Sequence, residues 1–222
     1  NLDNYGSCRI CSVEVALKEG GPGKVMASCH TPVAPGYYVY PSTDRIRRLR
    51  KNILELVLSE YPPERLIPEP GMLPTEFQTV VAAAGSPEVR YHRNVTHHEK
   101  DRSRPYVWSD LTECIKCYRC VRACDELQAE HVLGIYGRGD DSRIIKGFDQ
   151  SFRDSPCVSC GACVQTCPTN ALHDRYSVKT LKADRIVRTT CTYCGVGCNL
   201  DVKVADGQVR GIQAPLDSAT NR

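Results

Sequence analysis

Hydrophobic and polar residues alternate in two short runs near the start of the chain. The runs Cys11–Val15 and Lys24–Ser28 each follow the period of two that is typical of a β-strand with one buried face. Gly20-Gly21-Pro22-Gly23 separates them, and these residues favour a turn. The pattern therefore predicts a β-hairpin with a loose turn.

A helical period follows, beginning after Ser42 or Thr43, because either hydroxyl can cap a helix. Pro62-Pro63 is expected to end it. The basic residues between Arg45 and Lys51 would form the solvated face of this helix. The apolar residues, spaced three or four apart, would form the face that covers the small sheet: Ile46, Leu49, Ile53, Leu56 and Val57.

Residues 62–110 show no clear period and contain many proline and charged residues but no cysteine. We expect an extended connector that wraps a neighbouring domain or a partner subunit. Near the end of the chain, Asp206-Gly207 separates the alternating runs Leu200–Val204 and Gln208–Ile212. An Asp-Gly pair in this position predicts a second hairpin.

Composition excludes several classes of protein. No apolar run is long enough to span a bilayer, and residues 1–9 lack the basic and apolar regions of a secretory signal. We therefore expect a soluble, cytoplasmic protein. The net charge of +3 and the absence of basic residues interleaved with aromatic ones argue against nucleic-acid binding.

The 14 cysteines carry the strongest chemical signal. Two runs 43 positions apart share the spacing C-x2-C-x2-C-x3-C, and the second ends in Cys167-Pro168. In bacterial two-cluster ferredoxins the fourth cysteine of each run binds the other run's cluster. One 4Fe-4S cluster is therefore predicted at Cys114, Cys117, Cys120 and Cys167. The other is predicted at Cys157, Cys160, Cys163 and Cys124.

Structural zinc and disulfides are the alternatives for these eight residues. Structural zinc usually joins two C-x2-C pairs across a longer loop, whereas each run here holds four cysteines within eleven residues. A disulfide framework would need an oxidising compartment, to which nothing in the sequence points. The duplicated spacing favours iron–sulfur clusters.

A third group comprises Cys8, Cys11 and Cys29 on the predicted first hairpin. It supplies three of the four ligands of a 2Fe-2S cluster, and we expect the fourth upstream of Asn1 in a longer polypeptide. A redox dithiol at Cys8 and Cys11 is the alternative.

The fourth group is Cys191, Cys194 and Cys198, which also lacks one ligand of a cluster. A zinc site completed by histidine is the alternative, but no histidine follows His173. Together the two incomplete groups suggest that the sequence is an internal piece of a longer protein.

With these residues established, the sequence resembles the N-terminal part of the molybdenum- or tungsten-dependent formate dehydrogenase catalytic subunit, whose N-terminus is shared with complex I and iron hydrogenases. The resemblance covers nearly the whole chain. Gly6–Val15 with Ala27–Val33 looks like the 2Fe-2S domain, and Asp184–Arg222 looks like the opening of the molybdopterin oxidoreductase domain, including a further 4Fe-4S cluster at Cys191, Cys194 and Cys198.

The resemblance implies an α+β fold in four parts. These are a ferredoxin-like β-grasp 2Fe-2S domain with its helix (1–61), a connector (62–110), a bacterial two-cluster ferredoxin domain (111–183) and the start of a molybdopterin oxidoreductase 4Fe-4S domain (184–222). No catalytic residue is expected in this segment, because the pterin-bound molybdenum or tungsten and the residues that handle formate lie downstream in the family.

The function implied is electron transfer inside a formate dehydrogenase, toward a flavin-containing NAD-reducing subunit, a ferredoxin or a quinone-linked module. Many relatives carry an additional H-x3-C-x2-C-x5-C cluster in the connector, but His92, His97 and His98 occur here without any cysteine between Cys29 and Cys114. We interpret these histidines as solvated or hydrogen-bonded loop residues. A complex I large subunit and a stand-alone polyferredoxin are the alternative functions.

Overall fold

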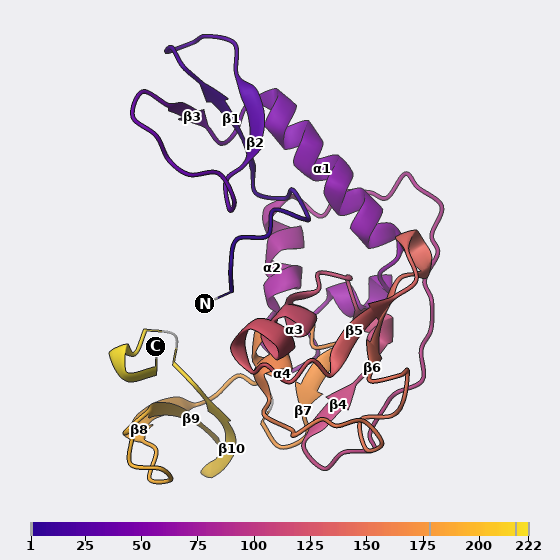
Figure 1. The fold of residues 1–222 in the computed structure, drawn as a ribbon, viewed down its shortest axis with the longest axis vertical. Coiled ribbons are helices and arrows are strands. Elements are labelled where there is room, and N and C mark those ends of the chain that lie inside the picture. The colour runs from indigo at the N-terminus through magenta and orange to yellow at the C-terminus, as the bar shows by residue number, and fades with distance from the viewer. Residues whose placement is uncertain (1, 178, 216, 222) are drawn as a thin grey trace.

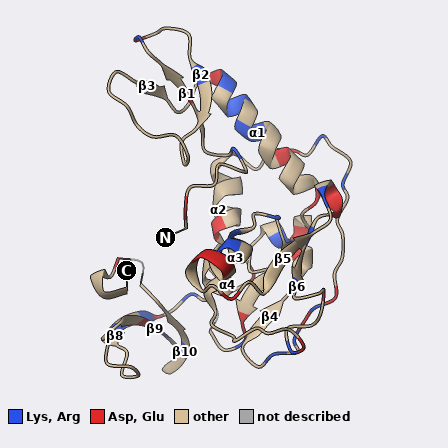
Figure 2. Ribbon diagram, in the orientation of Figure 1, with Lys and Arg blue, Asp and Glu red and all other residues tan. Residues whose placement is uncertain are grey.

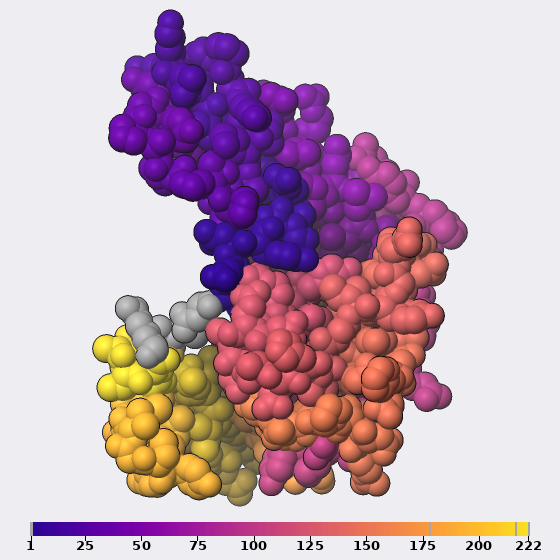
Figure 3. Space-filling model, viewed as in Figure 1, coloured from indigo at the N-terminus to yellow at the C-terminus, as the bar shows by residue number. Residues whose placement is uncertain are grey.

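A computed structural model describes residues 2–177, 179–215 and 217–221. The chain forms an N-terminal sheet with a long helix, a central unit of short helices and hairpins, and a C-terminal sheet (Figure 1). In the space-filling view the indigo N-terminal part lies above the pink and orange central part, and the yellow C-terminal part lies at its lower left (Figure 3). The combination of helices with separate antiparallel sheets confirms the predicted α+β class.

The first sheet has three antiparallel strands in the order β2-β1-β3. Strands β1 (Ser12–Ala16) and β2 (Lys24–Ala27) form the predicted hairpin, in which Val13 lies opposite Met26. Strand β3 (Tyr38–Tyr40) pairs with the other edge of β1. It is only three residues long, which is too short for an alternating pattern to reveal.

Helix α1 (Asp44–Ser59) begins where the sequence predicts, since the Thr43 hydroxyl accepts a hydrogen bond from the Ile46 N–H at 3.3 Å. The predicted apolar face is only partly correct, because Leu56 is 52% exposed. The buried face of α1 instead includes Glu55, a charged residue that a hydrophobic pattern would assign to the surface. The buried positions of this helix are Ile46, Leu54, Glu55, Leu58 and Ser59.

Burial of Glu55 is explained by its ion pairs with Arg90 at 2.5 Å and Lys51 at 3.8 Å. A buried carboxylate needs such partners, since leaving it unpaired would cost several kcal/mol. Arg90 comes from the connector, so this pair fixes the connector to the helix.

Only the first half of α1 covers the small sheet, which corrects the expectation that the whole helix does so. In that half, Arg50 donates a hydrogen bond to the Ser12 carbonyl of β1 at 2.6 Å. The second half packs against a different element, helix α2 (Glu76–Ala83). The apolar residues of that contact are Leu54, Leu58, Tyr61, Phe77 and Val81.

Helix α2 lies within residues 62–110 and was not predicted. Its N-terminus has a capping box, in which Thr75 accepts from the Gln78 N–H at 3.1 Å and the Gln78 side chain accepts from the Thr75 N–H at 2.7 Å. That Thr-x-x-Gln signal is present in the sequence but stands among prolines that obscured it. The connector also contains the short 3-10 helix Pro63–Leu66.

The central unit is built from two antiparallel strand pairs and two short helices. Strand β4 (Val107–Ser109) pairs with β7 (Leu172–Asp174), and β5 (Leu133–Tyr136) pairs with β6 (Arg143–Lys146). The helices are α3 (Arg119–Arg122), which continues as a π-helical turn over Ala123–Leu127, and α4 (Ala162–Thr166). Two 3-10 turns of this unit span Leu111–Glu113 and Gly139–Asp141, and another, Ala219–Asn221, follows the C-terminal sheet. The core of the central unit combines aliphatic residues with the buried cysteines Cys120, Cys124, Cys163 and Cys167.

The C-terminal sheet is antiparallel and has the order β10-β9-β8. Its strands are β8 (Arg185–Thr190), β9 (Asn199–Ala205) and β10 (Gln208–Gln213). The predicted hairpin is confirmed, since Asp206 and Gly207 both have positive φ angles, 52° and 69°, as a tight two-residue turn requires.

The chain has a mixed surface charge and no membrane-spanning element among the residues described. Figure 2 shows Lys and Arg along much of α1, where they are largely solvated. Within residues 2–177, 179–215 and 217–221, no helix has the length and apolarity that crossing a membrane requires.

The contact between α1 and α2 yields a stability prediction. Replacing Leu54, which is 3% exposed, by Ala should cost about 2–5 kcal/mol, because it removes buried apolar surface and leaves a cavity. Replacing the exposed Leu56 by Ala is the matched control and should change stability by less than about 0.5 kcal/mol. The measurement is the urea midpoint of the helical signal in circular dichroism, and equal midpoints for the two variants would contradict the described packing.

Candidate iron–sulfur centres

The two cysteine runs of the central unit have the same backbone shape. Positions 43 residues apart share the positive φ angles that let a tight loop fold around a central group. The matched pairs are Lys116 and Ser159, with φ angles of 54° and 57°, and Tyr118 and Gly161, with φ angles of 59° and 79°. The sequence repeat is therefore also a repeat in three dimensions.

In each loop an amide points at the first sulfur of the run. The Lys116 N–H donates to Cys114 Sγ, and the Ser159 N–H donates to Cys157 Sγ, both at 3.4 Å. Such N–H···S contacts stabilise negative charge on sulfur, which is the state that binds metal.

Two cavities in the central unit each bring together four cysteines. We call the first the Cys114 site, and its thiols are Cys114, Cys117, Cys120 and Cys167. We call the second the Cys157 site, and its thiols are Cys157, Cys160, Cys163 and Cys124. These are the two groups that the spacing argument formed, with the fourth cysteine of each run beside the three of the other. Their role as cluster ligands remains a prediction.

The fourth cysteines cross over because each follows a short helix that leads away from its own loop. Helices α3 and α4 pack against each other, so the residue after one helix lies near the loop before the other. Cys167 precedes Pro168 and has the extended conformation that a residue before proline prefers, with ψ at 123°. Helix α4 therefore ends at this cysteine. In the first run Asp125 stands at the equivalent position, and the helix continues through Cys124 as a π-helical turn.

Burial strongly affects the acidity of these thiols. Desolvation raises the pKa of Cys114 and of Cys163 to about 12. It also raises the pKa of Cys117 and Cys120, and neighbouring cysteines add to the shift. Thiols in such surroundings ionise only beside a compensating positive charge. Four soft sulfur donors in an apolar cavity fit a bound iron–sulfur cluster, because its iron ions would supply that charge.

Further hydrogen bonds reach the two crossing sulfurs. The Val132 N–H donates to Cys124 Sγ at 3.4 Å, and the hydroxyl of Thr169 lies 3.7 Å from Cys167 Sγ. Thr169 is almost completely buried, so its position is well defined by packing. Contacts of this kind tune the reduction potential of a cluster.

The N-terminal cysteines Cys8, Cys11 and Cys29 lie together at the end of the first hairpin. The Ser28 N–H and hydroxyl both donate to the Cys11 carbonyl, at 3.3 and 2.9 Å, and hold the two segments side by side. A hydrogen bond with the Cys11 thiol raises the pKa of Cys29, and Cys8 is close enough for its charge to add to this. Desolvation opposes ionisation of Cys11, but hydrogen bonds from Cys29 and Ser28 outweigh it and lower its pKa.

This N-terminal group is more exposed than the two central sites, because Cys8 and Cys29 are exposed and none of its three thiols is buried, whereas each central site contains two buried thiols. Gly6 permits the close approach of the chain, because it has a φ of 64° and a Cβ there would meet the His30 Cβ at 3.2 Å. The group therefore lies at the surface, where another protein could approach it.

Arg119 is near both the N-terminal group and the Cys114 site. Its guanidinium makes two hydrogen bonds to Glu76 of α2, at 2.6 and 2.7 Å. The pKa of Arg119 is raised mainly by this pairing, and the charges of Cys117 and Cys8 add to the shift. The N-terminal segment also contacts α3, where Arg122 stacks on Tyr5 at 4.7 Å. No pattern in the sequence signals this proximity, which arises from packing.

The C-terminal group lies in the turn between β8 and β9. The Cys191 N–H donates to the Cys198 carbonyl at 2.7 Å, which closes the loop that carries Cys194. The glycines on either side of Val196 both have φ angles above 70° and shape this turn. Tyr193 is 95% exposed, so the loop projects into solvent in the described chain.

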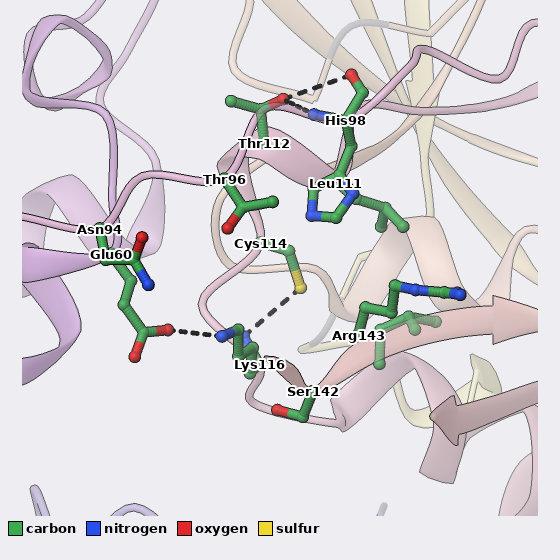
Figure 4. Close-up of a pocket in the computed structure, with 11 residues that line it drawn as sticks. Glu60, Asn94, Thr96, His98, Leu111, Thr112, Cys114, Lys116, Ser142 and Arg143 are labelled. Atoms are coloured by element: carbon green, nitrogen blue, oxygen red, sulfur yellow. Dashed lines mark hydrogen bonds and ion pairs between the residues drawn. The ribbon is translucent and has the colours of Figure 1, made fainter. Parts of the chain in front are cut away.

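The three connector histidines do not form a group of ligands in the described structure. His92 and His97 are exposed, whereas His98 is half-buried. The backbone N–H of His98 donates to the Thr112 hydroxyl at 3.0 Å. Figure 4 shows the His98 ring and the Cys114 thiol extending into one small cavity, whose other side carries Lys116. Burial lowers the pKa of His98, and the charges of Arg143 and Lys116 contribute. Among the described residues, no three His, Cys, Asp or Glu side chains are arranged to hold a single metal ion.

Two cations contact the backbone of cluster-site cysteines, and sequence reasoning missed both. Lys179 Nζ donates to the carbonyls of Gln165 and Cys167, at 2.8 and 2.9 Å. Desolvation lowers the pKa of Lys179, while the charge of Cys167 opposes this. Arg104 donates to the Cys157 carbonyl at 2.7 Å. Neither residue belongs to a recognisable motif, so no pattern in the sequence could have identified them.

Two family descriptions match parts of the chain. Residues 104–173 match the ferredoxin-like domain of NADH-quinone oxidoreductase subunit 3. Residues 184–222 match the molybdopterin oxidoreductase Fe4S4 domain. Both matches are to iron–sulfur domains of oxidoreductases.

Several curated proteins are similar over most of the chain. An NADH-quinone oxidoreductase subunit of Rhizobium meliloti is 31% identical over 100% of this chain and 25% of its own length. The NADP-reducing hydrogenase subunit HndD of Solidesulfovibrio fructosivorans is 34% identical over 75% of this chain and 28% of its own. A candidate formate dehydrogenase of Staphylococcus haemolyticus is 26% identical over 97% of this chain and 25% of its own. The chain thus spans about a quarter of the length of these relatives.

A solved structure with the same fold is the NAD+-reducing NiFe-hydrogenase in its H2-reduced state. It superposes with a TM-score of 0.67 and 27% identity, over 81% of this chain and 74% of that chain. The shared fold therefore includes most of the length described here.

The crossing of the fourth cysteines can be tested by paired substitutions. Cys167→Ala should damage the cluster of the Cys114 site, because Cys167 lines that cavity although it lies in the second run. Cys163→Ala, in the same run, should instead damage the cluster of the Cys157 site. Electron paramagnetic resonance of the anaerobically purified protein distinguishes the two signals. Loss of the same signal in both variants would contradict the crossed arrangement.

Proposed function

We propose that this chain, an iron–sulfur electron-transfer region of the type shared by NADH-quinone oxidoreductases, formate dehydrogenases and hydrogenases, belongs to a molybdenum- or tungsten-dependent formate dehydrogenase. In this role it carries electrons between a pterin-bound metal and a partner protein. The order of its parts supports the shared electron-transfer type. A ferredoxin-like unit over 104–173 is followed by the opening of a molybdopterin oxidoreductase domain over 184–222. The observation that favours a formate dehydrogenase over complex I is the connector, which has no cysteine between Cys29 and Cys114.

The ligands in this proposal are the cysteines of the four groups described above. The Cys114 and Cys157 sites would each hold a 4Fe-4S cluster with a complete set of four thiolates. Cys8, Cys11 and Cys29 would hold a 2Fe-2S cluster, and Cys191, Cys194 and Cys198 a further 4Fe-4S cluster, each with one ligand from elsewhere in a longer polypeptide. Such clusters accept and release one electron at a time.

The arrangement of the groups supports a path with the C-terminal group nearest the pterin and the N-terminal group at the exit. The C-terminal sheet adjoins the central unit at a cavity that Cys167, Lys179 and Lys203 line together. At the other side, Arg119 is close enough to both Cys117 of the Cys114 site and Cys8 of the N-terminal group for their charges to raise its pKa. The Cys114 site is thus adjacent to both neighbouring parts.

The exposed N-terminal group suits contact with a partner. Cys8 and Cys29 reach the surface, and Val33 and Tyr38 in the same unit expose apolar surface that a partner could cover. A flavin-containing NAD-reducing subunit is the partner that we propose. A ferredoxin or a quinone-linked module are the alternatives that reconstitution experiments would separate.

A complex I large subunit is the second candidate, and the 31% identity over the whole chain to an NADH-quinone oxidoreductase protein favours it. Against it stands the connector, which has no cysteine between Cys29 and Cys114. Complex I large subunits usually keep a cluster in this region, and its absence favours the formate dehydrogenase.

Metal and activity measurements on the full-length protein separate the two candidates. Anaerobic purification should yield iron for one 2Fe-2S and three 4Fe-4S clusters, together with molybdenum or tungsten and formate-dependent reduction of an artificial dye. Iron without molybdenum, tungsten or formate activity would favour the complex I type. Stoichiometric zinc with little iron would contradict both.

The proposed exit at the N-terminal group predicts a selective defect. Cys11→Ala in the full-length enzyme should leave reduction of a dye that accepts electrons near the metal site largely intact, because that dye does not need the exit cluster. Reduction of the physiological acceptor should fall by at least about tenfold, since a lost cluster breaks the chain of electron transfer. A parallel loss of both activities, in a protein that keeps its pterin metal, would show that the order is wrong.

A further inference from the structure

Two cations near the central sites donate to cysteine carbonyls and form no ion pair with a carboxylate among the described residues. Lys179 and Arg104 take part in no ion pair within residues 2–177, 179–215 and 217–221. Each instead donates to the backbone carbonyl of a cysteine, Lys179 to that of Cys167 and Arg104 to that of Cys157. One such cation therefore adjoins each of the two sites.

The other cations of the first cysteine run are neutralised. Lys116 pairs with Glu60 at 2.6 Å, Arg119 with Glu76 at 2.6 Å and Arg122 with Glu126 at 2.6 Å. An ion pair acts on a distant group only as a dipole, so its effect falls off more quickly than that of a single charge. Lys179 and Arg104, which contact a cysteine carbonyl of each site without such a pair, act there as single charges.

Both side chains are half-buried, which limits screening by water. Lys179 lies in the cavity that Cys167 and Glu76 also line. Arg104 donates to three carbonyls of one loop, those of Phe152 at 3.0 Å, Ser155 at 3.3 Å and Cys157 at 2.7 Å. These contacts hold both charges in fixed positions.

We propose that Lys179 and Arg104 are positioning residues that raise the reduction potentials of the two central clusters, Lys179 for the Cys114 site and Arg104 for the Cys157 site. Reduction adds one negative charge to a cluster, and a fixed cation nearby stabilises the reduced form more than the oxidised form. The proposal rests on the cluster ligands given under the proposed function, but not on the identity of the enzyme.

A purely structural role is the rival explanation. The Lys179 carbonyl accepts a hydrogen bond from Lys203 of β9, so Lys179 also joins the central unit to the C-terminal sheet. Arg104 likewise holds the loop before the second cysteine run. A structural role depends on shape and hydrogen bonding, whereas the proposed role depends on charge, and substitutions can separate the two.

The experiment measures the midpoint potential of each central cluster by redox titration with electron paramagnetic resonance, in the full-length protein. Lys179→Gln should make reduction of the Cys114-site cluster about tenfold less favourable, a shift of about 59 mV to lower potential for a one-electron couple. Arg104→Gln should shift the Cys157-site cluster in the same direction. Lys179→Arg and Arg104→Lys keep the charge and should restore most of each potential.

Two matched controls remove a positive charge without touching a cysteine carbonyl. Lys182 and Arg102 are exposed neighbours of the two residues, and Lys182→Gln and Arg102→Gln should leave both potentials nearly unchanged. A shift in these controls as large as in Lys179→Gln or Arg104→Gln would overturn the proposal. Unchanged potentials in Lys179→Gln and Arg104→Gln would also overturn it. Equal shifts of the two cluster potentials within each of these variants would do the same.

A further variant, Glu76→Gln, tests the sign of the effect if Lys179→Gln or Arg104→Gln fails to assemble its cluster. Glu76→Gln removes the anion beside Lys179 and also unpairs Arg119, so the potential of the Cys114 site should rise. An unchanged or lowered potential would contradict the electrostatic role. A shift at the Cys157 cluster in Lys179→Gln would point instead to an error in the crossed ligand assignment, and loss of formate activity alone would concern only the proposed enzyme.

Discussion

Convergence of buried thiols from two segments is the constraint on which the central unit depends. Cys120, Cys124, Cys163 and Cys167 belong to its hydrophobic core, so the groups proposed to bind metal are also the groups that fill the interior. Burial makes ionisation of such thiols unfavourable without a positive charge beside them. In a unit with only short strands and helices, metal binding and folding are therefore expected to be linked.

The neighbouring parts attach to this unit through charged contacts close to the same cysteines. Arg119 joins α2 to the first run through Glu76, and Lys179 joins the second run to the C-terminal sheet through Cys167 and Lys203. Contacts that fix the relative positions of the parts also place charges near the sites. Mechanical connection and electrostatic tuning are consequently difficult to separate except by charge-conserving substitutions.

The duplicated unit has diverged in ways that affect chemistry more than shape. The positive φ angles and the N–H···S contacts of the two loops are preserved. In contrast, Lys116 and Arg119 in the first run correspond to Ser159 and Ala162 in the second. The first run uses its charges to bind α1 and α2, whereas the second run relies on Arg104 from the connector. The two halves of the repeat therefore contact different neighbouring segments through different charged residues.

The sequence by itself determined the features that depend on local spacing. The two cysteine runs, the hairpin at Asp206-Gly207 and the cap of α1 at Thr43 each need only a few neighbouring residues, and their geometry follows from residue type. The grouping of Cys167 with the first run could also be predicted, because in a duplicated C-x2-C-x2-C-x3-C spacing the fourth cysteine of each run binds the other run's cluster.

Only the tertiary structure decided the features that depend on contacts between distant segments. Glu55 is buried because Arg90 reaches it from the connector, and Leu56 is exposed because α1 turns a different face toward α2. The positions of Lys179 and Arg104 follow likewise from packing. A single lysine or arginine has the same local signature wherever it occurs, and its effect on a cluster depends on where the folded chain holds its charge.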